Sequence, residues 1–278
     1  MMGIDRRIFL VGCPRSGTTM LQTVIAAHPE VMSFPESRLY RSVESQQRVL
    51  QALGWASRHA YGRMQSIYEE LVLDPGDLRR RWTVAGYAQD FFRTLDRSAL
   101  AAGKTVWLEK TPDHVQRLKE IQSVLPEAVF IHLIRGGAET VASLYDVTQR
   151  FPEAWGQGPW SLERCIARWR EDVAESLQYA TDPSHCLVGY EMFVADPETG
   201  VQQLCRFMGL DVASEMMQRD AGKGEEVVLS NEPWKTRSAQ SIRAGGGKFA
   251  TVFDESQQAR VLDSLAGTQS QLDAVLCP

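Results

Sequence analysis

Short apolar runs alternate along the chain with longer segments in which apolar residues recur at intervals of three and four. Four of the apolar runs are bounded by polar or turn residues and are typical of buried strands: Ile8–Val11, Val106–Leu108, Val129–Ile134 and Cys186–Val188. The segments with helical periodicity predict helices over Thr19–Ala27, Asp113–Leu125, Leu162–Tyr179 and Pro197–Met208. Because strands that alternate with helices form parallel sheets covered on both faces, we expect an α/β fold.

Two long segments do not follow this alternation. Residues 37–104 lack a convincing strand, which predicts a helical insertion. Between Asp220 and Phe253 the periodicity fails and Gly, Ser, Lys and Arg accumulate, as expected for a long loop that is either functional or mobile. The chain contains no internal repeat and no Pro-, Gly- or Ser-rich linker. The pattern therefore predicts a single domain over residues 1–278.

Composition and charge exclude several classes of protein to which the chain could otherwise belong. The 278 residues are 44% hydrophobic and 23% charged, which is ordinary for a globular protein and excludes a disordered or coiled-coil chain. The formal net charge is −5, so no nucleic-acid partner is expected, and any phosphate must be bound by a local cluster of donors. No apolar run approaches the roughly 18 residues that would predict a membrane span.

The first apolar run and the pattern of cysteines bear on the cellular compartment in which the protein is expected. Ile8–Val11 is much shorter than the roughly 7–15 apolar residues of a secretory signal, so we expect a strand there and no signal peptide. The five cysteines form no Cys-x-x-Cys pair, which argues against a disulfide framework and against a zinc site. These features predict a cytoplasmic protein without a metal centre.

The sharpest motif lies where the first predicted strand meets the first predicted helix. Residues 12–19 read GCPRSGTT, and the spacing of Gly12 and Gly17 matches phosphate-binding loops of the pattern G-x-x-x-x-G-K-[ST]. In such a loop, backbone N–H groups and the first turn of the helix surround an anion. The alternative interpretation is a strand-to-helix turn in which Ser and Thr cap the helix.

Position 18 of this loop carries threonine where a nucleoside triphosphatase carries lysine. A nucleoside triphosphatase needs the cation of that lysine at the terminal phosphates, so hydrolysis of a nucleoside triphosphate is not expected. Arg15, three residues earlier, can supply a cation to the same anion. We therefore expect the phosphate to be bound by Arg15, Ser16, Gly17, Thr18 and Thr19.

Four segments of the chain share their order and their strand–helix context with one enzyme family. They are PRSGTTML at residues 14–21, LEKTPDH at 108–114, FIHLIR at 130–135 and GYEMFVADP at 189–197. Together they resemble the sulfotransferases that use 3′-phosphoadenosine 5′-phosphosulfate (PAPS), most of all the bacterial and Golgi-type branch that includes the tyrosylprotein sulfotransferases. The resemblance extends over about residues 8 to 250. It implies a P-loop-like, three-layer α/β/α fold with a central, mainly parallel sheet.

The resemblance also implies a site for the nucleotide. Arg135 ends a predicted strand and Ser143 lies eight residues later, just over two helical turns, so both can contact one phosphate monoester. By resemblance this group is the 3′-phosphate of PAPS. The family places Tyr190 beside the adenine, and its loop over the nucleotide is best matched by Ser238 and Lys248.

At Gly136 and Gly137 the sequence departs from the family, which usually carries Asp followed by a second residue, often Pro or Arg. Backbone N–H groups can substitute for a lost side-chain contact at these positions. The departure leaves open how the segment after Arg135 is shaped.

The resemblance assigns the catalytic residues as well. Lys110 is the cation expected at the bridging oxygen of the donor, together with Arg15. Two residues are candidates for the base that removes the proton of the acceptor. Glu36 matches the glutamate of the tyrosylprotein branch, whereas His114 lies near the position of the cytosolic branch, whose histidine follows the lysine by two residues. That position is Pro112 here, so Glu36 is favoured.

The function implied is in-line transfer of a sulfuryl group from PAPS to a hydroxyl or amine, with release of adenosine 3′,5′-diphosphate and no metal. A P-loop small-molecule kinase is a second hypothesis, which Thr18 disfavours, and a non-catalytic nucleotide-binding homologue is a third, which the intact Arg15 and Lys110 disfavour. The acceptor is expected to be a small molecule, a sugar or a peptide. Aromatic residues of the insertion either line its pocket or pack the core: Tyr40, Trp55, Tyr61, Tyr68, Trp82, Tyr87, Phe91 and Phe92.

Overall fold

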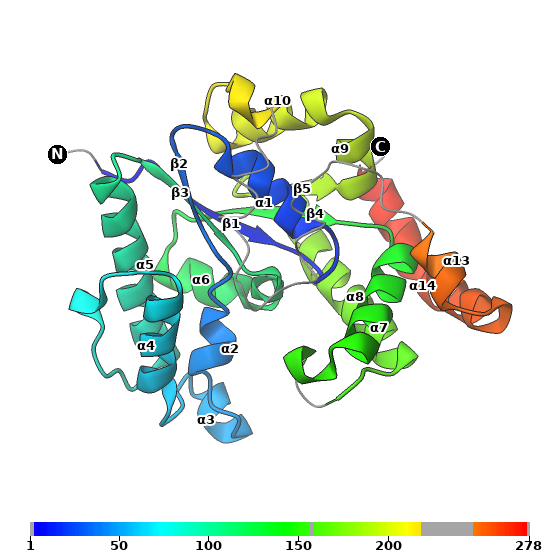
Figure 1. The fold of residues 1–278 in the computed structure, drawn as a ribbon, viewed down its shortest axis with the longest axis horizontal. Coiled ribbons are helices and arrows are strands. Elements are labelled where there is room, and N and C mark those ends of the chain that lie inside the picture. Colours follow the sequence, from blue (N-terminus) through cyan, green and yellow to red (C-terminus); the bar gives the residue numbers. More distant parts are fainter. Residues whose placement is uncertain (1–2, 156–157, 218–246, 277–278) are drawn as a thin grey trace.

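Five parallel strands form a central sheet in the computed structural model, which describes residues 3–155, 158–217 and 247–276. The order of the strands across the sheet is β2-β3-β1-β4-β5. Their bounds are β1 (Arg6–Val11), β2 (Val31–Phe34), β3 (Val106–Lys110), β4 (Val129–Ile134) and β5 (His185–Gly189). Figure 1 shows helices on both sides of the sheet, so the expected α/β fold is confirmed.

Successive side chains of β1 enter the two opposite faces of the sheet. Ile8 and Leu10 belong to a core shared with α1 (Thr18–Ala26) and α10 (Pro197–Met208). Phe9 and Val11 belong to a second core on the other face. All four side chains are fully buried. Burial on both faces explains why the sequence shows a continuous apolar run in β1 instead of an alternation with polar residues.

The segment 37–104 is helical and packs against the second face of the sheet. It comprises α2 (Leu39–Val43), α3 (Arg48–Ala52), α4 (Ala60–Glu70), the short 3₁₀ helix η1 (Pro75–Asp77) and α5 (Val84–Ala101). Five aromatic side chains of this segment are buried in the core: Tyr40, Tyr68, Tyr87, Phe91 and Phe92. Most aromatic residues of the insertion are therefore part of the core, while Trp55 and Trp82 are exposed.

A third group of helices packs around the β4–β5 end of the fold (Figure 1). It contains α7 (Gly137–Arg150), α8 (Leu162–Leu177), α13 (Lys248–Val252) and α14 (Glu255–Leu276). Trp169 of α8 and Leu265 of α14 are buried in the core that these helices share. Among the described residues, no helix combines the length and the apolarity that crossing a bilayer requires.

The structure corrects three expectations. Val31–Phe34 forms β2 at the edge of the sheet, where the sequence predicted no strand. The predicted helix Asp113–Leu125 divides into the 3₁₀ helix η2 (Pro112–Arg117) and α6 (Leu118–Val124). The expected loop up to Phe253 includes the helix α13, which begins at Lys248. The remaining described elements are η3 (Pro152–Trp155), α9 (Tyr190–Ala195) and η4 (Ser214–Met216).

Candidate active site

Each strand of the sheet ends at a residue or loop that the sequence assigned to the site. The phosphate loop follows β1, Glu36 follows β2, and Lys110 is the last residue of β3. Arg135 follows β4 and Tyr190 follows β5. Because all five strands are parallel, these positions lie along the same edge of the sheet. Open α/β sheets bind their ligands at this carboxyl edge.

The loop between β1 and α1 has a backbone that needs its two glycines. Gly12, Arg15 and Gly17 have φ values of 149°, 75° and 100°. A Cβ atom on Gly12 would lie 2.4 Å from the carbonyl oxygen of Leu133, and one on Gly17 would lie 2.7 Å from the Tyr190 ring. The glycines therefore allow the backbone of β4 and the Tyr190 ring to approach the loop closely. Left-handed residues within such a turn are typical of backbone concavities that bind anions.

Polar side chains of the loop fit an anion. The Ser16 hydroxyl is buried and makes no hydrogen bond within the described residues. Thr18 and Thr19 are buried in the first turn of α1. Arg15 Nε donates to Ser143 Oγ at 3.3 Å. This contact brings the predicted 5′-phosphate loop next to a predicted 3′-phosphate residue, and a phosphate-bearing ligand would supply the acceptor that Ser16 lacks.

Arg135 and Tyr190 lie against one another at the ends of β4 and β5. The guanidinium carbon of Arg135 lies 4.6 Å from the centre of the Tyr190 ring, which is a cation–π contact. The backbone of Arg135 is also held, because Trp169 Nε1 donates to its carbonyl oxygen at 2.9 Å. The structure thus brings together two residues that the sequence assigned to the 3′-phosphate and the adenine.

The two glycines after Arg135 lie at the start of α7, and a side chain at Gly137 would block the packing of other helices there. A Cβ atom on Gly137 would lie 2.6 Å from Leu265 of α14 and 3.1 Å from Trp169. The Gly136 N–H donates to Glu191 Oε1 at 3.0 Å. The departure from the family pattern is therefore matched by close packing of α14 and α8 against the start of α7.

Lys110 and Glu36 form the charged centre of the site. Lys110 Nζ lies 3.1 Å from Glu36 Oε2, and the two side chains are only 1% and 11% exposed. Arg38 Nε lies 3.1 Å from the other carboxylate oxygen, Glu36 Oε1. Pairing of β2 with β3 places Phe34 opposite Glu109, so the chain beyond β2 passes directly beside Lys110. The edge strand missed by the sequence analysis is what positions Glu36.

His114, the other candidate base, lies in the first turn of η2 and is buried. Its Nδ1 lies 3.1 Å from Glu109 Oε2, and its Nε2 is buried without a hydrogen-bond partner among the described residues. Glu36 contacts Lys110 directly, whereas His114 contacts Glu109, the residue before Lys110 on β3. Of the two candidate bases, Glu36 is therefore the one that lies in contact with Lys110.

Glu109 is a polar site residue to which the sequence analysis gave no role. Burial would raise the pKa of its carboxyl group, but interaction with His114 and hydrogen bonds from His114, Thr111 and Ser37 outweigh it and hold the pKa below its ordinary value. One feature of the sequence could have pointed to Glu109: it is an acidic residue that directly follows the apolar run Val106–Leu108 and directly precedes Lys110.

Of the two residues predicted for the loop over the nucleotide, Ser238 and Lys248, the structure describes only Lys248. Lys248 is the first residue of α13, and its Nζ lies 2.6 Å from Asp146 Oδ2 on α7, three residues after Ser143. The adjacent Gly247 N–H donates to Glu139 Oε1 at 2.9 Å. Ser238 lies outside the described residues.

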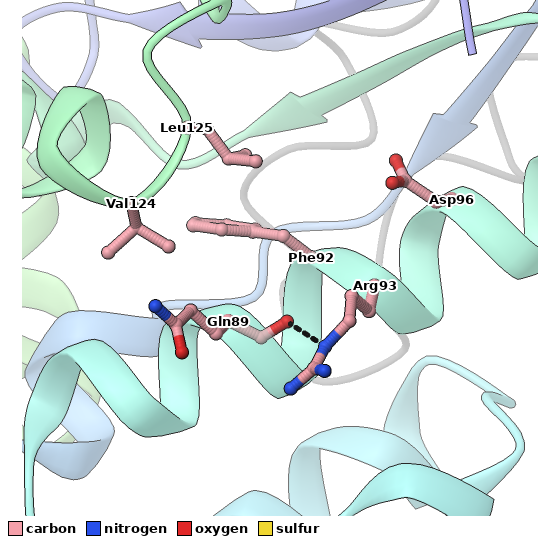
Figure 2. A pocket seen from close by; sticks show the side chains of 6 residues that line it. All are labelled: Gln89, Phe92, Arg93, Asp96, Val124 and Leu125. Carbon is pink, nitrogen blue, oxygen red and sulfur yellow. Dashed lines mark hydrogen bonds between the residues drawn. The ribbon is translucent and has the colours of Figure 1, made fainter. Parts of the chain in front are cut away.

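A pocket of about 250 Å³ lies elsewhere, between α5 and the end of α6 (Figure 2). Its lining consists of Gln89, Phe92, Arg93, Asp96, Val124 and Leu125. Of these, only Phe92 was among the aromatic residues that the sequence offered for an acceptor pocket. Asp96 in this pocket already accepts hydrogen bonds from Arg7 and from Trp107 Nε1. Within the described ranges, no group of three His, Cys, Asp or Glu side chains could hold a metal ion.

Residues 7–214 match the sequence profile described as "Sulfotransferase family". The chain belongs to this family. Members of the sulfotransferase family are PAPS-dependent transferases, and the α/β sheet with its P-loop-like turn is the architecture of that class. The match covers the loop, Glu36, Lys110, Arg135 and Tyr190, but it assigns no role to any single residue.

Curated relatives of this sulfotransferase are distant. Protein-tyrosine sulfotransferase 2 of Gallus gallus is 26% identical over 228 residues, which are 80% of this chain and 57% of that protein. Protein-tyrosine sulfotransferase A of Caenorhabditis elegans is 22% identical over 81% of this chain and 55% of its own length. Nodulation protein NoeE of Sinorhizobium fredii is 32% identical over 56% of this chain and 33% of its own. The chain thus spans little more than half of the first two proteins and a third of the last.

Solved structures share the fold of this sulfotransferase. The sulfotransferase domain from the curacin biosynthetic pathway superposes with a TM-score of 0.57 at 19% identity, covering 96% of this chain and 98% of that one. Mouse sulfotransferase SULT7A1, solved as a complex with PAP, gives a TM-score of 0.58 at 14% identity, covering 98% and 86%. Identities this low establish the common fold alone.

Proposed function

We propose that this sulfotransferase transfers a sulfuryl group from PAPS to a hydroxyl or amine of its acceptor and releases adenosine 3′,5′-diphosphate. The observation that carries the proposal is the contact of 3.1 Å between Lys110 and Glu36, next to the phosphate loop. Lys110 pairs with Leu10 of β1, and the Gly12 N–H donates to the carbonyl oxygen of Pro112. A cation and a carboxylate thus lie beside an anion-binding turn.

The donor is proposed to be bound by two groups of residues. Arg15, Ser16, Gly17, Thr18 and Thr19 bind its 5′ end through backbone N–H groups, hydroxyls and one cation. At the other end of the nucleotide, Arg135 and Ser143 bind the 3′-phosphate, Tyr190 packs beside the adenine, and Ser238 and Lys248 belong to the segment over the nucleotide. The hydrogen bond from Arg15 to Ser143 supports one continuous site for both phosphates.

The catalytic roles follow from the charges. PAPS supplies a sulfuryl group whose leaving group is a phosphate, so the protein has only to position the reactants and to stabilise charge. Lys110 and Arg15 stabilise the negative charge that grows on the 5′-phosphate as the S–O bond breaks. Glu36 accepts the proton of the acceptor as its oxygen or nitrogen bonds to sulfur.

Calorimetric titration without added metal tests the donor. We expect adenosine 3′,5′-diphosphate to bind with a micromolar or lower Kd and ADP to bind more weakly. Arg15→Ala and Arg135→Ala should each remove the binding, because each deletes a charge-assisted contact to phosphate. Equal or tighter binding of ADP would contradict the proposal and favour the kinase hypothesis.

Incubation with ³⁵S-labelled PAPS and a panel of acceptors tests the transfer. A tyrosine-containing peptide is the first acceptor to try, because two of the relatives are named protein-tyrosine sulfotransferases. Sugars and small phenols complete the panel. We expect labelled product with wild-type protein and none with Glu36→Gln. Failure to label any acceptor would count against the proposal.

A further inference from the structure

Glu109 is a buried carboxylate whose partner residue on each neighbouring strand is a phenylalanine. Its side chain is fully buried on β3, directly before Lys110. The register pairs it with Phe9 of β1 and with Phe34 of β2. A carboxylate in such surroundings is costly unless hydrogen bonds compensate for the lost water. The hydrogen-bond partners of Glu109 therefore indicate which part of the structure the buried carboxylate stabilises.

The partners of Glu109 come from the two segments that carry the catalytic pair. Glu109 Oε1 accepts hydrogen bonds from Ser37 Oγ at 2.7 Å, from the Ser37 N–H at 3.3 Å and from Thr111 Oγ1 at 2.6 Å. Glu109 Oε2 is bonded to His114 Nδ1 at 3.1 Å. Ser37 is adjacent to Glu36, and Thr111 is adjacent to Lys110. The carboxylate thus ties together the chain on either side of the Glu36–Lys110 contact.

Thr111 adds a second connection to the segment that contains Glu36. Its Oγ1 accepts a hydrogen bond from the Arg38 N–H at 3.2 Å. Arg38 has a φ of 50°, a left-handed conformation that residues with a side chain rarely adopt. Such a conformation persists where surrounding contacts hold it. Hydrogen bonds to Glu109 and Thr111 thus hold Ser37 and Arg38, the two residues that follow Glu36.

We propose that Glu109 is a positioning residue for sulfuryl transfer: its carboxylate anchors Ser37 and Thr111 and thereby keeps Glu36 in contact with Lys110. The inference rests on the proposed function. Side chains alternate along a strand, so Glu109 and Lys110 point to opposite faces of the sheet. Glu109 consequently acts through its hydrogen-bond partners and does not contact the substrate.

The first test replaces the charge and keeps the volume. In Glu109→Gln the side chain retains one acceptor oxygen but loses the charge that the four hydrogen bonds surround. We expect kcat for transfer from labelled PAPS to fall about 10- to 100-fold, since small displacements of catalytic groups have effects of this size. The Kd for adenosine 3′,5′-diphosphate should change much less than kcat, because most of its proposed ligands lie on other segments, in the phosphate loop and after β4 and β5.

Asp90→Asn provides the matched control. Asp90 is an equally buried carboxylate, but it lies on α5 and pairs with Arg81 and Arg93, away from the site. We expect this variant to lower Tm without changing kcat at temperatures where it is folded. A kcat that falls equally in Asp90→Asn and Glu109→Gln, or in neither, would overturn the proposal and leave Glu109 with a role in stability alone.

Thr111 supplies a second test that does not alter a buried charge. Thr111→Val has nearly the same shape but removes the hydroxyl that joins Glu109 to the Arg38 N–H, whereas Thr111→Ser retains it. We expect kcat to fall in the valine variant and to be rescued in the serine variant. Equal kcat in the two would overturn the proposal. Absence of transfer by the wild-type protein would instead refute the proposed function on which it rests.

Discussion

Lys110 and Glu36 carry opposite charges 3.1 Å apart and are almost out of contact with water. A pair in this environment interacts more strongly than a pair on the surface, and the removal of one partner leaves a buried charge. Arg38 also contacts Glu36, so the carboxylate keeps a partner when the lysine is absent. This arrangement allows the role of the lysine to be tested without leaving the glutamate isolated.

Lys110→Met is expected to lower kcat by about 10²–10³-fold, because the loss of one donor to the developing charge has an effect of that order. The affinity for adenosine 3′,5′-diphosphate should change much less than kcat. Single-turnover transfer from labelled PAPS measures the first quantity and calorimetry the second. Lys119→Met, on the exposed side of α6, is the control and should match the wild type. Similar losses in both variants would refute a catalytic role for Lys110.

Gly17→Ala is expected to abolish nucleotide binding. A Cβ atom there would lie 2.7 Å from the Tyr190 ring, and the φ of 100° is unfavourable for alanine. The loop and the proposed adenine-binding residue must then move apart. Gly267→Ala in α14 is the control, because nothing lies within 4 Å of its added Cβ. Calorimetry with adenosine 3′,5′-diphosphate should show binding in the control alone, and retained binding in Gly17→Ala would contradict the expectation.

At the scale of secondary structure, the sequence predicts four of the five strands and misses β2, one of the two edge strands. β1 and β4 are recognisable because burial on both faces gives them nearly continuous apolar runs, and β3 and β5 because each contains a short apolar run bounded by polar or turn residues. β2 has only four residues and contains Ser33, so its pattern does not stand out from a loop. The contact of Glu36 with Lys110 depends on this strand. The candidate base could therefore be proposed from resemblance, but its position could not be derived from periodicity.

Strands β4 and β5 carry a buried pair of histidines that is expected to make stability depend on pH. His132 Nε2 and His185 Nδ1 are 2.8 Å apart, and Ser176 and Gln122 bond to the outer nitrogens. Burial lowers the pKa of His132 to about 3, with a contribution from His185, and lowers the pKa of His185 to about 4. Both rings are thus neutral in the folded protein at neutral pH.

The unfolded chain, with histidine pKa values near 6.5, binds more protons than the folded protein below that pH. The stabilisation is therefore complete above about pH 6.5 and is lost as pH falls toward about 4, by up to about 1.4 kcal/mol per pH unit for each ring. Denaturant unfolding at pH 7 and at pH 5 measures this loss. His132→Asn should lower stability at pH 7 and reduce the difference between the two pH values. An unchanged difference would contradict the assignment.

At the scale of the whole molecule, the site is assembled from five segments that are distant in sequence and adjacent in the sheet. The order β2-β3-β1-β4-β5 places the phosphate loop at the centre, the proposed catalytic pair on one side and the proposed 3′-phosphate and adenine residues on the other. A nucleotide that contacts both sides would connect strands from either half of the sheet. Its binding energy would add to the free energy of unfolding.

Adenosine 3′,5′-diphosphate at 100 times its Kd should raise the free energy of unfolding by about 2.7 kcal/mol, which corresponds to an increase in Tm of about 5 °C or more. Adenosine 5′-monophosphate at the same concentration should raise Tm less, because it lacks the phosphate assigned to Arg135 and Ser143. Arg135→Ala should remove the difference between the two nucleotides. Thermal denaturation with each ligand measures all three values. A difference that persists in Arg135→Ala would show that the 3′-phosphate is recognised elsewhere, since only contacts to that group distinguish the two ligands.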